Sequence, residues 1–217
     1  MCKEETLRLW EWERTFNDGP LEYDGSCISF KDDERHHPGL DVLEMNARGR
    51  ILTSNPVPKD FETFDFSAEI KGGGTHQNIA VGYATSSTSS IVYEGISGKI
   101  VKETWKETME GRRRIGWKYS DPDFWTEQRK VKTLLGSEPF GENDIIKCCV
   151  RRKNISEREY TLISFKKNDN IIGQEALKGR PQIWPVISVG LCEAQIQVEM
   201  DITDTTHEHQ SGKNSYF

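Results

Sequence analysis

The chain has 217 residues, a net charge of −6 and 35% hydrophobic residues, which suits one large globular domain with a polar surface. No segment approaches the roughly 18 consecutive apolar residues of a membrane helix, and the N-terminus lacks the apolar run of a secretion signal. The acidic balance disfavours nucleic acid as a partner, because phosphate contacts need clustered lysine and arginine. The composition therefore predicts neither membrane insertion nor nucleic-acid binding.

The cysteines point to a reducing compartment. There are five of them, at positions 2, 27, 148, 149 and 192, and this odd set fits neither a zinc site nor a disulfide framework. We therefore expect a cytoplasmic protein, with the nucleus as the alternative, and we expect no cofactor.

Short segments of alternating polarity, separated by Gly, Pro, Asn and Asp, dominate the chain. Phe64, Phe66, Ala68 and Ile70 alternate with polar residues, which is typical of a strand with one buried face. Further strands are predicted over 27–31, 49–53, 79–84, 114–119, 144–150, 159–166, 184–190 and 195–202. Since no long stretch has a helical period, the pattern predicts an all-β fold, a two-sheet antiparallel β-sandwich spanning residues 10–202.

Other segments do not show this alternation. Residues 1–9 are an N-terminal extension, and the polar residues 203–217 are predicted to be a disordered C-terminal tail. Residues 85–113 begin with a Ser/Thr cluster and are predicted to form a long loop with some local structure. The glycines at 72–74 are predicted to form a turn between strands.

Candidate catalytic groups are isolated from the partners that catalysis requires. Cys148 and Cys149 are adjacent on a predicted strand, so their side chains point to opposite faces, and Cys148 shares the core face with Ile146 and Val150. A reactive thiol needs a neighbouring base or a helix N-terminus, which the sequence does not show. His207-Glu208-His209 lacks a third metal ligand of fixed geometry. The sequence therefore predicts a protein that is not an enzyme and binds no metal.

Aromatic residues in predicted loops have two interpretations. Phe124 and Trp125 lie in a predicted turn, and Tyr93 and Trp105 lie in the 85–113 segment. Such residues either anchor their own loop to the core or serve as binding hot spots. Both interpretations remain open at this point.

Six segments together resemble the SPRY domain family, in the family's order. They are FDFSAEI (64–70), IAVGYAT (79–85), IGWKYSD (115–121), FGENDIIKC (140–148), TLISFKKNDNIIG (161–173) and IWPVISVGL (183–191). The resemblance covers roughly residues 10–202 and implies a SPRY-like β-sandwich.

Residues 176–190, ALKGRPQIWPVISVG, are similar to the SPRY domains that accompany a SOCS box. Those domains resemble substrate receptors of a ubiquitin ligase that read short extended peptides in a preformed loop pocket. The chain departs from them at Leu191, where they carry Trp, and at Cys192, where they carry Gly, and no SOCS box follows residue 202. The resemblance implies pocket positions at Arg50, Thr85, Tyr93, Gly190, Leu191 and Cys192.

We therefore expect a protein-interaction module that binds a short peptide or a partner's loop. Its predicted surface combines residues 50–56, 85–93, 121–125 and 190–192, with Tyr93 as the aromatic anchor beside Thr85 and residues 190–192. Phe124 and Trp125 are the next candidates. The alternative is a sandwich that binds a small phosphorylated ligand through a basic pocket, with charge from Arg50, His36 and Arg112–Arg114, or one that binds carbohydrate.

Overall fold

The structure is a computed structural model, and every secondary-structure element in its described part is a β-strand. No helix in that part is long and apolar enough to cross a membrane. The described residues are 12–16, 21–23, 27–30, 49–73, 79–86, 89–107, 127–136, 138–189 and 194–201.

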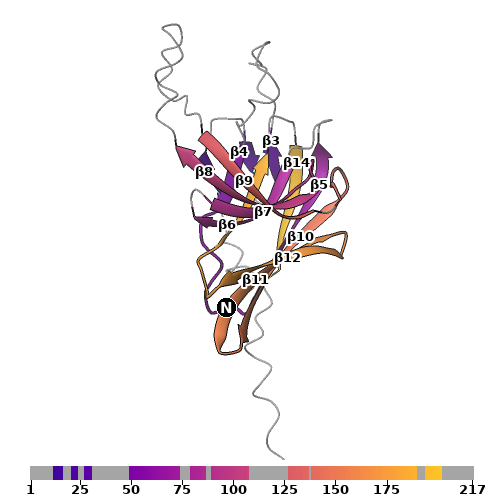
Figure 1. Cartoon of the computed structure of the whole chain (residues 1–217). Helices are drawn as coiled ribbons and strands as arrows, with labels where there is room; N and C mark the ends of the chain where they lie inside the picture. Colours follow the sequence, from indigo (N-terminus) through magenta and orange to yellow (C-terminus); the bar gives the residue numbers. More distant parts are fainter. Residues whose placement is uncertain are drawn as a thin grey trace, which may run out of the picture.

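Two seven-stranded sheets, built from antiparallel pairs, form the fold (Figure 1). Sheet A runs in the order β1 (Trp12–Phe16), β4 (Gly49–Thr53), β13 (Trp184–Val189), β6 (Ile79–Ser86), β7 (Ser89–Glu94), β8 (Lys99–Glu107) and β9 (Glu127–Gly136). Sheet B runs in the order β12 (Asn170–Lys178), β11 (Arg158–Lys167), β10 (Ile145–Ile155), β5 (Thr63–Gly73), β14 (Ala194–Asp201), β3 (Cys27–Phe30) and β2 (Leu21–Tyr23). The predicted two-sheet antiparallel sandwich is confirmed.

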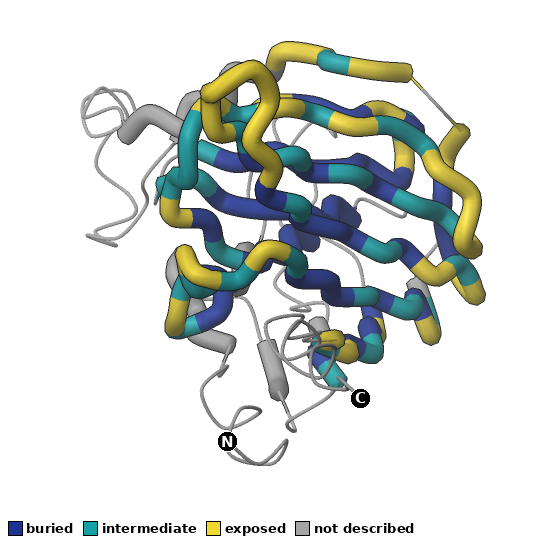
Figure 2. Tube along the Cα trace, turned by 90° about the horizontal axis from the view of Figure 1, so that it is seen from below, coloured by how far each residue is buried: buried dark blue, intermediate teal, exposed yellow. Residues whose placement is uncertain are grey.

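The core lies between the inner faces of the two sheets. Phe66 from sheet B meets Tyr83 from sheet A edge to face, with ring centroids 5.3 Å apart, and both side chains are fully buried. The Tyr83 hydroxyl donates a hydrogen bond to the backbone carbonyl of Cys148 at 3.0 Å, which ties sheet A to sheet B. Figure 2 shows the same arrangement as buried residues along the central strands and exposed residues at the turns.

A second apolar cluster involves the other side of sheet A. Val92 alternates with the core residues Ile91 and Tyr93 along β7, so it belongs to the opposite face, yet it is also buried. The described members of this cluster are Leu52, Ala80, Ala84, Val92, Val101 and Val186, with Trp184 packed against them. Strands in this part of sheet A are therefore buried on both faces.

Two predictions of local structure are wrong. Residues 85–113 are not a long loop, because β7 and β8 form a hairpin there, and Trp105 lies within β8. Gly72 and Gly73 belong to β5 and pair with β14 instead of forming a turn. The predicted strand at 114–119 and the predicted tails at 1–9 and 203–217 lie outside the described residues.

The predicted register of the cysteine pair is confirmed. Cys148 is fully buried in the main core, and Cys149 faces Asp65 and Ser164 across the neighbouring strands. Cys149 is also buried, at 2% exposure, although it lies on the opposite face. Both thiols are free, so the two residues do not form a disulfide.

Candidate functional site

The strand register separates parts of the predicted binding pocket. In the antiparallel pair of β6 and β13, Ala84 is opposite Trp184 and Ile79 is opposite Val189. The end of β13 therefore lies beside the start of β6, about 17 Å from the Ala84 end at roughly 3.3 Å per residue. The sequence prediction puts Thr85, which follows Ala84, beside residues 190–192, which follow Val189, but the register places Ala84 and Val189 at opposite ends of this strand pair. Residues 190–192 themselves lie outside the described part of the chain.

Tyr93 is a core residue instead of an exposed anchor. Its side chain has no exposed surface, and its ring packs on Phe140 and Phe165 at centroid distances of 4.8 and 6.3 Å. Its hydroxyl donates to the backbone carbonyl of Glu138. The prediction that Tyr93 anchors a bound peptide is therefore wrong, because strand alternation places the ring with Ile91 on the inner face of β7. The alternative interpretation, that this aromatic holds its own segment on the sandwich, fits these contacts.

The other predicted site residues are only partly described. Arg50 lies in β4 opposite Ser188, but its side chain is outside the described atoms. Thr85 is half-buried, and its hydroxyl lies 3.4 Å from the carbonyl oxygen of Ser89. Positions outside the described residues are Gly190, Leu191, Cys192, Phe124 and Trp125.

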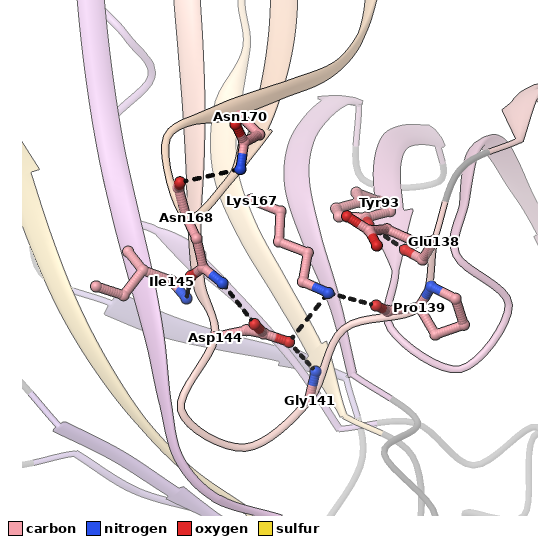
Figure 3. A network of polar contacts seen from close by, with 9 residues as sticks. All are labelled: Tyr93, Glu138, Pro139, Gly141, Asp144, Ile145, Lys167, Asn168 and Asn170. Atoms are coloured by element: carbon pink, nitrogen blue, oxygen red, sulfur yellow. Dashed lines mark hydrogen bonds and ion pairs between the residues drawn. The ribbon is translucent and has the colours of Figure 1, made fainter.

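A polar network centred on Asp144 joins two segments that carry much of the family resemblance, residues 140–148 and 161–173 (Figure 3). One carboxylate oxygen of Asp144 accepts from the Gly141 amide at 2.8 Å, and the other accepts from the Asn168 side chain at 2.7 Å. Asn168 in turn accepts from the Ile145 amide, and the Lys167 ammonium lies 3.5 Å from Asp144. Since all these contacts are internal, the network builds the fold and offers no ligand site.

The electrostatics of Asp144 follow from this network. Partial burial acts to raise the pKa of the carboxyl group, but the hydrogen bonds from Gly141 and Asn168, together with Lys167, outweigh it and hold the pKa below its usual value. The carboxylate is therefore charged near neutral pH.

A different arrangement is found in the segment that follows β4. Residues 54–62 leave sheet A and cross the end of the sandwich before β5 begins. Val57 is buried and its amide donates to the Ile183 carbonyl at 2.8 Å, which fixes this segment beside the start of β13. The exposed positions on it are Asn55, Lys59, Asp60 and Glu62.

Arg152 binds the backbone of this segment. It continues the inner face of β10 after Val150, and its side chain is only 7% exposed. Its Nη1 atom donates to the carbonyl oxygens of Pro58 and Phe61, the latter at 3.0 Å, and its backbone amide donates to Glu62 at 2.8 Å. Burial lowers the pKa of the Arg152 guanidinium, and the charge of the nearby Arg180 lowers it further.

Arg180 also binds the backbone of this segment. Its Nη1 atom donates to the Lys59 carbonyl at 3.1 Å, and its Nε atom donates to the Glu159 carboxylate at 3.1 Å. The preceding Gly179 has a φ of +71°, its amide donates to the Glu159 carbonyl, and its own carbonyl accepts from the Thr161 hydroxyl at 2.8 Å. These bonds fix the turn from which Arg180 reaches the segment.

We call this region, made of residues 54–62, 179–184 and Thr85, the clamped-loop end. Thr85 belongs to it because Ala84 pairs with Trp184. The arrangement offers a preformed surface with exposed polar groups and half-buried Arg180 and Trp184. The sequence carried signals for it in the Arg151–Lys153 basic run and in the LKGR tetrapeptide at 177–180, but neither signal indicated that the two arginines converge.

The buried Cys148 thiol stays protonated near neutral pH. Burial raises the pKa of Cys148, and the charges of Cys149 and Asp65 raise it further. Within the described ranges, no three His, Cys, Asp or Glu side chains gather as metal ligands would.

No protein-family model matches the sequence, and no curated protein is significantly similar to it. Among solved structures, a human SPRY domain is 17% identical, with a TM-score of 0.48, and the match covers 82% of this chain and 94% of that one. A carbohydrate-binding module, CBM66 from Bacillus subtilis, is 11% identical with a TM-score of 0.47, covering 87% and 94%. The VIP36 exoplasmic/lumenal domain, in a form bound to Ca²⁺ and Man3GlcNAc, is 12% identical with a TM-score of 0.43, covering 92% and 87%. These likenesses assign neither a family nor a ligand to the chain.

Proposed function

We propose that this chain is an intracellular, SPRY-type protein-interaction module that binds a short peptide or a partner's loop at the clamped-loop end. One observation carries the proposal. Arg152 and Arg180, which are both far in sequence from this loop, donate hydrogen bonds to its backbone carbonyls. The acceptors are the carbonyls of Pro58, Lys59 and Phe61. A loop that is fixed before binding loses less conformational entropy when a partner docks, which is the arrangement expected of a recognition surface.

The residue types at this end also suit protein recognition. Arg180 and Trp184 are half-buried, and arginine and tryptophan are enriched among binding hot spots. Asn55, Lys59 and Asp60 provide exposed polar groups around them. An extended segment of a partner could therefore combine contacts with a rigid surface and polar contacts at its rim.

We extend the proposal to a substrate-recognition adaptor of the cytoplasm, including recognition of substrates for a ubiquitin ligase. The support is the similarity of residues 176–190 to the SPRY domains that accompany a SOCS box. Arg180, which completes the clamp, lies within that stretch. The free thiols of Cys148 and Cys149 suit a reducing compartment.

The proposal is tested by selecting peptides from a random display library on the whole chain and measuring their affinity for variants. Lys59→Glu reverses an exposed charge but keeps the clamped carbonyl, so it should weaken the selected peptides about tenfold without changing the melting temperature. Lys132→Glu is the matched control, because it makes the same charge change at an exposed position of β9. The proposal fails if no peptide is enriched, or if both variants weaken binding equally.

A further inference from the structure

The guanidinium of Arg152 uses only one of its three nitrogens as a donor to the clamped loop. The other two, Nε and Nη2, are buried and have no hydrogen-bond partner. Together they form one side of the guanidinium plane, where two N–H groups point in the same direction. This side matches the two oxygens of a carboxylate and can bind them in parallel.

The guanidinium of Arg152 has no described carboxylate in direct contact. The charges of Asp60 and Glu159 favour its charged form from nearby, but neither forms an ion pair with Arg152 in the described part of the chain, and Glu159 is bound by Arg180. A water molecule could occupy the free N–H groups, but it would bring no counter-charge. An anion would satisfy the hydrogen bonds and the charge together.

Polar residues of the surface lie close to Arg152. Arg152 is held by the carbonyls of Pro58 and Phe61, and the intervening Lys59 and Asp60 are exposed. Arg180 is half-buried and is bound to the exposed Glu159. Rearrangement of these surface side chains would expose the guanidinium without opening the main core.

We propose that the Nε and Nη2 side of Arg152 binds a carboxylate of the partner, with Arg180 as the second positive charge beside it. The inference rests on the proposed function and specifies its ligand: the bound segment carries an Asp or Glu side chain, or a free C-terminus, that enters the clamped-loop end. The partner is therefore an acidic or C-terminal peptide segment.

The test follows the Nε–Hε signals of the arginine side chains of the whole ¹⁵N-labelled chain by NMR. Arg152→Lys, which lacks the parallel N–H pair, identifies the Arg152 signal by its loss. The protein is titrated with sodium acetate, and separately with sodium chloride at equal ionic strength and with acetamide. We expect a saturable shift of the Arg152 signal with acetate alone. The inference is overturned if the signal does not move, or if chloride moves it equally.

Two further probes distinguish the sources of the carboxylate. N-acetyl-aspartate N-methylamide offers a side-chain carboxylate, and N-acetylalanine offers a C-terminal one. The probe that binds more tightly identifies the source, and Arg152→Lys should weaken it about 10- to 100-fold. Arg158→Lys, at an exposed position on the neighbouring strand β11, is the matched control and should leave its affinity unchanged. Equal weakening by both substitutions would overturn the inference.

A melting curve of Arg152→Lys shows whether the clamped loop still folds. If it does not, the Arg152 signal is assigned from the backbone resonances of the wild-type chain, and Arg180→Lys provides the second test. This variant should weaken the acetate response of the Arg152 signal while leaving that signal visible. If Arg152→Lys is unfolded and Arg180→Lys shows an unchanged acetate response, the inference is overturned. If selected peptides bind at the clamped-loop end but no carboxylate moves the Arg152 signal, the proposed function stands and this inference fails.

Discussion

Replacing Asp144 by Asn should destabilise the fold by about 2 kcal/mol. The carboxylate accepts from the Gly141 amide at 2.8 Å and from Asn168 at 2.7 Å, and its side chain is only 19% exposed. An amide has one acceptor oxygen, so one of these donors would face an NH₂ group. Each hydrogen bond to a charged group contributes about 1.5–3 kcal/mol. For a chain of this size, a loss of about 2 kcal/mol lowers the melting temperature by roughly 4–8 °C.

The same variant tests whether the charge of Asp144 matters. Because the folded-state pKa is lowered, the ionised carboxylate stabilises the fold above the ordinary Asp pKa of about 3.9, and this contribution is lost as pH falls through the folded pKa. Urea unfolding should therefore show a constant difference between wild type and Asp144→Asn from pH 7 to about 5. The difference should shrink below about pH 4.

The control is Asp169→Asn in the adjacent hairpin turn. Asp169 is exposed and has a φ of +67°, which Asn also tolerates, so its substitution should be nearly neutral. A difference for Asp144→Asn that stays constant down to the lowest pH at which both proteins fold would refute the electrostatic explanation. An equal loss in both variants would refute the role given to the network.

Three further predictions concern buried positions. Tyr93→Phe should lower the free energy of unfolding by about 1 kcal/mol, because it removes the hydrogen bond to Glu138, and Tyr93→Ala should lower it by about 3–5 kcal/mol. Tyr93→Phe should leave peptide affinity unchanged. A loss of affinity without a loss of stability would show that Tyr93 is a binding residue after all. Under native conditions, mass spectrometry should find Cys27 modified by a thiol reagent well before Cys148, whose pKa is raised by burial, and rapid labelling of Cys148 would contradict the register. Gly98→Ala should lower the melting temperature, because φ is +62° and the new methyl would lie 2.5 Å from the backbone of Glu138, whereas an unchanged melting temperature would contradict this close approach.

The sequence predicts strands well where one face is buried and the other is exposed to solvent. Thr161, Ile163 and Phe165 alternate with more exposed residues in β11, and all three are fully buried as their spacing predicts. The turn after β11 follows from local chemistry too, since Asn168 and Asp169 both have positive φ, which Asn and Asp tolerate. Alternation and turn chemistry are local properties, so a single sequence reveals them.

Strands that lack this alternation of buried and exposed residues are not predicted from the sequence. In β7, residues of both faces are buried, so Val92 is as apolar as its neighbours and the alternation disappears. Much of β9 is exposed at the edge of sheet A, including Lys132 and Thr133, and its apolar residues do not alternate regularly with polar ones. Alternation in the sequence therefore predicts neither strand.

The candidate site depended on contacts that a single sequence does not reveal. Arg152 reaches Pro58 across 94 residues, and Arg180 reaches Lys59 across 121 residues. Without the register of β10, β11 and β13, no local pattern indicates that two arginines act on one loop. The resemblance pointed to Tyr93 by its position in the sequence, but the face of β7 decides whether that ring contacts solvent or the core.

The position of the last strands has a consequence for how the protein is made. β13 lies between β4 and β6 in sheet A, and β14 lies between β5 and β3 in sheet B, so the C-terminal strands are interior in both sheets. A ribosome that has synthesised the chain up to residue 180 has made most strands of both sheets but neither of the strands that join their halves. The sheets therefore stay incomplete until β13 and β14 have been synthesised, and folding must then form contacts as distant in sequence as Ile28 and Ile196. We expect slow refolding and a dependence on chaperones during synthesis.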